Sequence, residues 1–145
     1  MRIRHIVFVF VLTALLTGCS SLPARTALPG QGEDAGKIVV YRDTFGIPHI
    51  YAPTVEDGLY AMGRAQAEDR PEQLLINLKM ALGEYASIVG KDAVDHDITH
   101  RMFDHYGISK RRFDGQDEDT KRRTLAFVQG VIGHYKAHPE DIPAW

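Results

Sequence analysis

The hydrophobic pattern after residue 36 begins with two short segments of β type. Lys37–Arg42 is rich in β-branched and aromatic residues and predicts a strand. Residues 43–46 run from Asp to Gly, as a type I turn prefers. Ile47–Tyr51 predicts a second strand, which should begin at Pro48 or lie at an edge, because proline donates no ladder hydrogen bond. The pattern therefore predicts a β-hairpin.

Helical spacing follows the hairpin. Thr54 can cap a helix over 55–69, in which Ala61, Gly63, Ala65 and Ala67 would allow close packing on a neighbour. We expect a new helix after it, because Asp69 can be its N-cap, Pro71 suits the first turn and Glu72 completes a capping box. The apolar face of that helix continues to Val89, and Gly90 is the expected stop.

Two further helices complete the predicted elements. One is expected over 93–106, ending at Gly107, and one over 118–137, ending before Pro139. The second has an apolar stripe formed by Leu125, Val128, Ile132 and Tyr135. The fold class is thus α+β, a β-hairpin followed by about four helices. Because two strands alone are marginal in water, we expect the chain to be a fragment of a larger fold.

The N-terminus has the pattern of an exported lipoprotein. Arg2 and Arg4 precede a short apolar run, and Leu16-Thr17-Gly18-Cys19 matches the bacterial lipobox. We therefore predict a signal peptide over residues 1–18, lipidation at Cys19 and a flexible tether over residues 19–36. An uncleaved anchor helix is the alternative. Ser20 is not the aspartate that retains lipoproteins at the inner membrane, so the outer membrane facing the periplasm is favoured.

Composition narrows the possible partners. The formal net charge is −2, so no strong positive field would attract nucleic acid. Cys19 is the only cysteine, which excludes a disulfide framework.

Few side chains suggest chemistry. His96 and His100 share a helical face in metal-ligand spacing, although a solvated face is favoured and we predict no metal ligand. His49 is interpreted as a hydrogen-bonded structural residue. Asp43, Glu68 and Asp69 are interpreted as capping groups or as buried partners of the arginines Arg42, Arg64 or Arg70.

Three ordered segments resemble the N-terminal part of the penicillin acylase α chain. Val39–Ala52 resembles its strand and R-D-x-x-G-x-P-H-I-x-A motif, and the stretch 63–70 is similar to G-x-A-x-A-Q-D-R. Residues 82–90 are similar to its G-x-x-A-E-x-x-G turn, whereas Pro71 stands where the family has a bulky apolar residue. The residues that match the family, all expected to be structural, are Arg42, Asp43, Gly46, Pro48, His49, Gln66, Asp69 and Arg70.

The resemblance implies a fragment of an Ntn-hydrolase αββα sandwich over residues 37–145. In that family an amide bond of an acylated small molecule, such as a β-lactam, an acyl-homoserine lactone or a lipopeptide, is cut by the N-terminal serine of a separate β chain. No catalytic residue is expected here, since no serine of this chain matches that position. The rest of the α chain and the β chain would be partners, and calcium is possible in the full fold. The alternative is a non-enzymatic periplasmic lipoprotein that serves as a binding module.

Overall fold

The computed structural model describes residues 34–145. The predicted signal peptide, Cys19 and nearly all of the tether therefore lie outside the described residues. None of the helices within 34–145 has the length and apolar character needed to cross a membrane.

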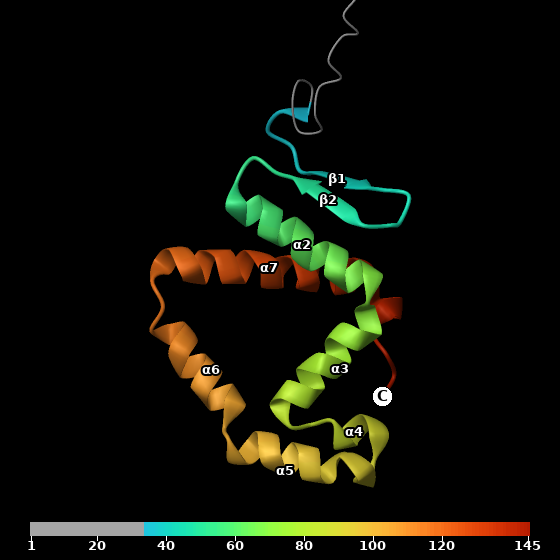
Figure 1. The fold of residues 1–145 in the computed structure, drawn as a ribbon, viewed down its shortest axis with the longest axis vertical. Helices are drawn as coiled ribbons and strands as arrows, with labels where there is room; N and C mark the ends of the chain where they lie inside the picture. Colours follow the sequence, from blue (N-terminus) through green and yellow to red (C-terminus); the bar gives the residue numbers. More distant parts are fainter. Residues whose placement is uncertain (1–33) are drawn as a thin grey trace, which may run out of the picture.

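The hairpin forms as predicted (Figure 1). Strand β1 (Val39–Arg42) pairs antiparallel with β2 (Pro48–Tyr51), and Val39 lies opposite Tyr51. The turn closes through a hydrogen bond from the N–H of Gly46 to the carbonyl of Asp43 at 2.9 Å. Gly46 has a φ of +80°, which a side chain would disfavour.

The most extensive contact between helices is the crossing of α2 (Val55–Asp69) with α7 (Glu118–Ala137). Gly63 of α2 lies against the backbone of Phe127, and Gly130 of α7 lies against the backbone of Tyr60. A Cβ atom at either glycine would overlap the facing carbonyl oxygen. The prediction that small residues of 55–69 allow close packing is therefore confirmed.

The apolar stripe of α7 is not the face that packs on α2. Leu125, Val128 and Ile132 are exposed, whereas Gly130 and His134 are buried. The reason is that α2 approaches α7 backbone to backbone, and only the glycine face admits that distance.

Helix α3 (Pro71–Leu82) is shorter than the sequence suggests. Gly83 adopts a left-handed conformation and caps it, and α4 (Ala86–Val89) follows as a separate turn. The prediction of one helix up to Val89 is therefore wrong, because the glycine supplies a stop seven residues earlier than Gly90 does.

The capping box at the start of α3 is also wrong. Arg70 occupies the N-cap and makes no side-chain capping bond there. The Asp69 carboxylate instead binds the guanidinium of Arg42. The ion pair with Arg42, which was the other role expected for Asp69, therefore takes the place of the cap.

The helix expected over 93–106 is two helices, α5 (Val94–Met102) and α6 (His105–Asp114). Asp104, with a φ of +49°, separates them, and its carboxylate accepts the N–H of Gly107. Gly107 thus lies in the first turn of α6, and the prediction that it ends a helix is wrong. Short 3₁₀ turns occur at Lys91–Ala93 and at Pro139–Asp141, the second within the predicted loop-like tail.

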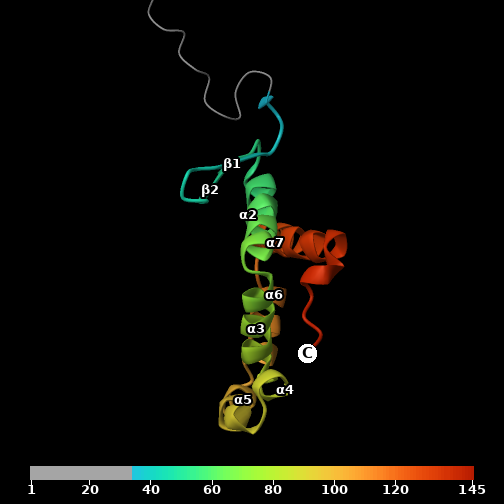
Figure 2. The ribbon, with the colours of Figure 1, turned by 90° about the vertical axis from the view of Figure 1, so that its right-hand side faces the viewer.

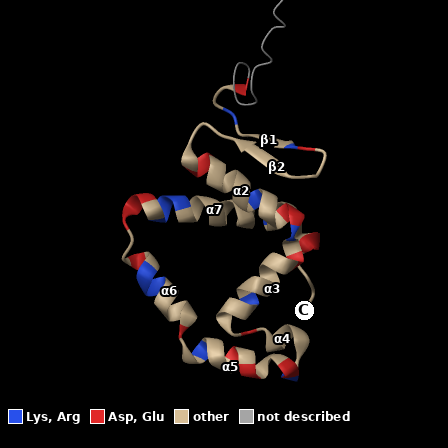
Figure 3. Ribbon diagram, in the orientation of Figure 1, with Lys and Arg blue, Asp and Glu red and all other residues tan. Residues whose placement is uncertain are grey.

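Helices α3, α5 and α6 form a circuit that returns to α7, and Figure 2 shows this circuit edge-on as one thin layer. Among the described residues, the buried apolar side chains are all alanines: Ala61, Ala65, Ala67 and Ala93. None of the larger side chains is fully buried there, and many large apolar ones are exposed. Charged residues of both signs occur along the helices (Figure 3). The layer therefore leaves apolar surface uncovered.

Candidate functional site

Arg42 ties the hairpin to the end of α2. Its guanidinium contacts both carboxylate oxygens of Asp69, at 2.8 Å and 3.1 Å, and Glu68 at 3.3 Å. It also donates to the carbonyl of Gly46 at 3.1 Å. The hydrogen bond with Asp69 holds the pKa of Arg42 above its ordinary value. The expected ion pair is present, but it is not buried as predicted, since the Arg42 side chain is 33% exposed.

Asp43 organises the hairpin loop. Its Oδ1 accepts the N–H groups of Phe45 and Ile47, and its Oδ2 accepts the Nε2–H of His49 at 3.1 Å. The bond from His49 holds the pKa of Asp43 below its usual range, and the two backbone bonds add to this effect against a partial cost of burial. Asp43 and His49 therefore form a carboxylate–imidazole pair across the loop.

Such a pair also orients the base in hydrolases that use a serine nucleophile, so the position of hydroxyl groups decides what it can do. Two serines fall within 34–145. The Ser87 hydroxyl donates to the carbonyl of Glu84 beside α4, and Ser109 lies on α6. Neither belongs to the hairpin or to α2, so in this part of the chain the Asp43–His49 pair shapes the loop and has no serine to activate.

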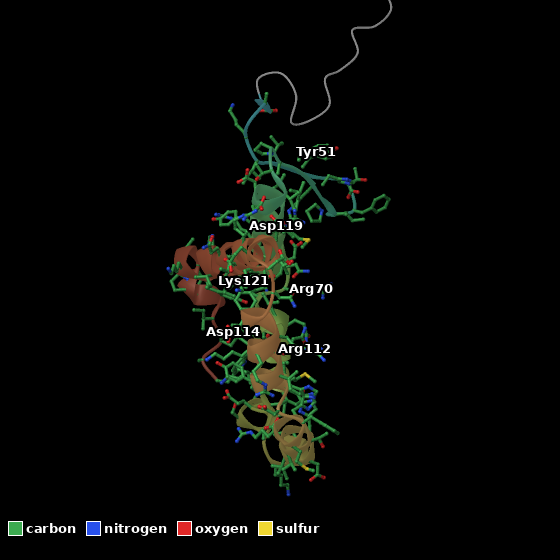
Figure 4. All side chains as sticks on the ribbon, turned by 90° about the vertical axis from the view of Figure 1, so that its left-hand side faces the viewer. Tyr51, Arg70, Arg112, Asp114, Asp119 and Lys121 are labelled. Carbon is green, nitrogen blue, oxygen red and sulfur yellow. The ribbon has the colours of Figure 1, made fainter. Side chains whose placement is uncertain are left out.

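An open groove lies where α2 meets α3. Its volume is about 330 Å³, and Gln73 donates to Asn77 at 2.9 Å along its wall. Figure 4 labels Arg70 at this junction. The lining residues are Gln66, Asp69, Arg70, Gln73, Leu74 and Asn77. Three of the sequence-predicted residues, Gln66, Asp69 and Arg70, thus line this open groove, and of these only Asp69 also contacts Arg42.

The α4–α5 corner contains the buried polar residue that the sequence did not single out. The Asp97 carboxylate accepts the N–H groups of Tyr85 and Ala86, each at 2.8 Å, and contacts Nδ1 of His96. Burial acts to raise the pKa of Asp97, but these bonds outweigh it and leave the pKa below its ordinary value. An aspartate between two histidines gave no local signal, because its partners precede it by more than ten residues.

His96 and His100 share one face of α5, as their spacing predicts, with ring centroids 3.9 Å apart. Within 34–145 no group of three or more histidine, cysteine or acidic side chains is arranged to hold a metal ion. The predicted face is therefore real, and it presents two imidazoles.

Comparison with known proteins decides the family. The family model described as penicillin amidase matches residues 37–144. The chain belongs to the penicillin amidase family. The resemblance of the three ordered motifs is thereby confirmed.

Curated relatives of this penicillin amidase segment carry two kinds of name. It is 31% identical over 118 residues to "Penicillin acylase 2 proenzyme" of Pseudomonas sp. (strain SE83), covering 81% of this chain and 15% of that protein. It is 33% identical to penicillin G acylase of Escherichia coli over 67% of this chain and 11% of that protein. It is 24% identical to the acyl-homoserine lactone acylase QuiP of Pseudomonas putida, covering 89% and 17% of the two chains. The chain thus spans less than a fifth of the length of these relatives.

The fold agrees with the family. A solved thermostable penicillin G acylase from Alcaligenes faecalis superimposes with a TM-score of 0.63 at 24% identity, covering 74% of this chain and 59% of that chain. The predicted class, a hairpin followed by helices from a penicillin amidase fragment, is confirmed, with five helices of nine residues or more in 34–145. Arg42 of the hairpin motif meets Asp69 and its neighbour Glu68 at the end of α2, although they are separated by more than 20 positions.

Proposed function

We propose that this chain is the N-terminal part of a lipid-anchored amidohydrolase of the penicillin acylase type. The complete enzyme would hydrolyse the amide bond of an acylated small molecule, namely a β-lactam, an acyl-homoserine lactone or a lipopeptide. The names of the relatives, penicillin acylase and acyl-homoserine lactone acylase, support the first two substrate classes. The nucleophile in this proposal is the N-terminal serine of a β chain, so residues 1–145 alone are inactive.

The observation that carries the proposal is the missing half of the core. The apolar side chains buried within 34–145 are all alanines, while Phe45 is 88% exposed and Leu125 is 47% exposed. Burial of large apolar side chains is the main favourable term in folding. A further layer is therefore needed, and we assign it to the rest of the α chain and to the β chain. The word proenzyme in the name of one relative supports a processed, multi-chain enzyme.

The proposed reaction is acyl transfer in two steps. The serine hydroxyl attacks the amide carbonyl, its proton passes to the serine's own α-amino group, and the amine leaves with that proton. Water then cleaves the acyl-enzyme ester and regenerates the serine. Arg42, Asp43 and His49 act only by fixing the hairpin on α2. A calcium ion, if the full fold holds one, takes no part in these two steps.

A comparison of two expressed proteins tests the proposal. Residues 19–145 should give no hydrolysis of a chromogenic phenylacetyl or long-chain acyl amide above the background rate. The genomic reading frame continued past codon 145 should hydrolyse one of them, and replacing the serine at its processed N-terminus with alanine should abolish that activity. Turnover by residues 19–145 alone would overturn the assignment. A stop codon followed by unrelated sequence would favour the non-enzymatic binding module.

The membrane address is a separate part of the proposal. Lipidation at Cys19 would anchor the protein to the outer membrane, facing the periplasm, through the tether up to Gly36. Labelling cells with radioactive palmitate should mark the wild-type protein, and the Cys19→Ser variant should remain unlabelled and uncleaved. Equal labelling of that variant would contradict the anchor without affecting the assigned hydrolase class.

A further inference from the structure

The two outer edges of the β-hairpin offer different sets of backbone groups. The N–H of Asp43 donates to the carbonyl of Ile47 at 3.2 Å, and the next pair in register is Arg42 with Pro48. Along an antiparallel ladder, pairs that exchange hydrogen bonds alternate with pairs whose N–H and C=O groups point outward. The residues with outward groups are therefore Val40 and Arg42 on β1 and Pro48 and Ile50 on β2.

The outer edge of β1, formed by the outward N–H and C=O groups of Val40 and Arg42, is the better template for a further strand. Within residues 34–145 none of these four groups has a backbone partner. On β2, Pro48 has no N–H, so Ile50 supplies the one outward N–H of that strand. Unpaired edge groups accept an added strand, whereas proline at an edge opposes it. Strand addition is therefore expected at β1.

Uncovered apolar surface lies beside the same strand. Strand β2 makes more contact with α2 than β1 does, and an open groove of about 210 Å³ remains between β1 and α2. Its apolar lining includes Ile38, Val40 and Tyr60, and Arg64 and Glu68 add one charge of each sign. Ile38 and Val40 are still 40% and 44% exposed. A strand bonded to β1 would lie about 4.8 Å from it, so its side chains would reach this groove.

The relatives show how much further chain is available to supply the strand. This chain spans 15% of one penicillin acylase proenzyme and 11% of the Escherichia coli penicillin G acylase. A sheet of only two strands is marginal in water and needs a third strand or more. The added strand should have at least four residues, to match β1, with apolar residues at alternate positions that face the groove.

We propose that the outer edge of β1 binds an extended strand from the part of the same enzyme that follows residue 145. Val40 and Arg42 each donate one N–H and accept one N–H across this edge, and the apolar side chains of the added strand cover Ile38 and Val40. The inference rests on the proposed function, because that proposal assigns the missing layer to the rest of the enzyme. It adds which strand receives that layer and through which backbone groups.

Hydrogen exchange resolved to single amides tests the edge without any substitution. The complete enzyme, expressed from the reading frame continued past codon 145, is compared with the full 145-residue chain. The amides of Val40 and Arg42 should exchange at least about 100-fold more slowly in the complete enzyme, because outward groups gain protection only from a new partner. The Ile50 amide, which points outward from β2, is the internal control and should keep its rate.

Each other result contradicts a definite part of the proposal. A hydrolytically active enzyme in which Val40 and Arg42 exchange as fast as in the 145-residue chain would overturn the added strand and leave the proposed function standing. Equal slowing at Ile50 would indicate general burial and would also overturn it. Slow exchange without hydrolysis would contradict the proposed function and support the strand.

Two further results would assign the edge to a different occupant and overturn the proposal. Protection that disappears on dilution, together with dissociation in analytical ultracentrifugation, would assign it to a second copy of the chain. Slow exchange of Val40 and Arg42 already in the monomeric 145-residue chain would assign it to a segment within that chain. A stop at codon 145, read from the DNA, would overturn the strand and the proposed function together.

Discussion

The α2–α7 crossing and the α4–α5 corner both join helices, but they do so by different means. At the crossing, Gly63 and Gly130 let two backbones touch. At the corner, Asp97 binds two amides at the start of α4, and the Nε–H of Arg101 donates to the carbonyl of Gly83 at 2.8 Å. The crossing therefore depends on the absence of side chains at two glycines, and the corner depends on charged side chains that form hydrogen bonds with specific backbone groups. The first should respond to added methyl groups, and the second should respond to pH.

The largest effect is expected at the crossing. Gly130→Ala would place a methyl group onto the carbonyl oxygen of Tyr60, and neither backbone can move without separating the helices. Overpacking of this kind costs about 1–3 kcal/mol of the free energy of unfolding, and at a backbone contact the upper end applies. Urea unfolding followed by circular dichroism measures the loss.

Gly58→Ala is the matched control in the facing helix. A Cβ atom at Gly58 would lie 3.8 Å from the Cβ of Ala52, an ordinary contact. This substitution should be neutral or stabilise by about 0.5–1 kcal/mol, because alanine favours a helix interior over glycine. If both variants lose the same stability, close backbone approach does not explain the crossing.

The next effect is expected at the corner. Asp97→Asn leaves at most one carbonyl oxygen for the two N–H groups of Tyr85 and Ala86, so these amides should exchange with deuterium faster than in the wild type. Asp95→Asn, an exposed change on the same helix, should leave their exchange unaltered. Unchanged protection in Asp97→Asn would show that the carboxylate does not hold the corner.

The pH dependence of the corner follows from the same carboxylate. The pKa of Asp97 is lower in the folded protein than its ordinary value of about 3.9. The ionised group therefore stabilises the fold fully above that ordinary value, and the contribution is lost as the pH falls through the lower, folded pKa. Exchange of the Tyr85 and Ala86 amides, corrected for intrinsic rates, should accelerate in that acidic range in the wild type and not in Asp97→Asn.

The smallest effect is expected at Arg42, whose ion pairs are partly exposed and screened by salt. Arg42→Lys keeps the charge but loses the two-pronged contact with Asp69. The hairpin amides should exchange slightly faster, and the difference from the wild type should shrink at high salt. Arg112→Lys on α6, an exposed arginine labelled in Figure 4, should have no such effect. A large, salt-independent change in the hairpin would contradict this assignment.

Local patterns predicted the elements whose signals lie within a few residues. Thr54 caps α2 as expected, accepting the N–H of Asp57 at 3.1 Å, and the 118–137 helix has the predicted bounds. Strand β2 begins at Pro48, as expected for a residue that has no backbone N–H to donate to the ladder. Each of these features is decided by backbone geometry and short-range hydrogen bonds.

Features decided by distant partners were missed. For Asp69 two roles were expected, a helix cap and an ion pair with an arginine, and local spacing did not show that the pair with Arg42 excludes the cap. Gly107 was expected to end a helix, but the break lies at Asp104. Asp104 adopts an unusual positive φ, which the sequence does not indicate. The apolar stripe of α7 did not indicate its contact with α2, because apolar periodicity selects leucine and valine, whereas close backbone contact selects glycine. The two amide bonds of Asp97 belong to the same class of longer-range pairings.

The glycine crossing also makes everything between α2 and α7 a single closed loop. Once the two helices meet, the segment from Arg70 to Asp117 is anchored at both ends, and each doubling of such a loop costs only about 0.6 kcal/mol of closure entropy. Insertions or deletions among α3, α4, α5 and α6 should therefore change the free energy of forming the crossing only slightly. The crossing should instead slow folding, because contacts between residues so far apart in sequence form late and raise the contact order of the domain.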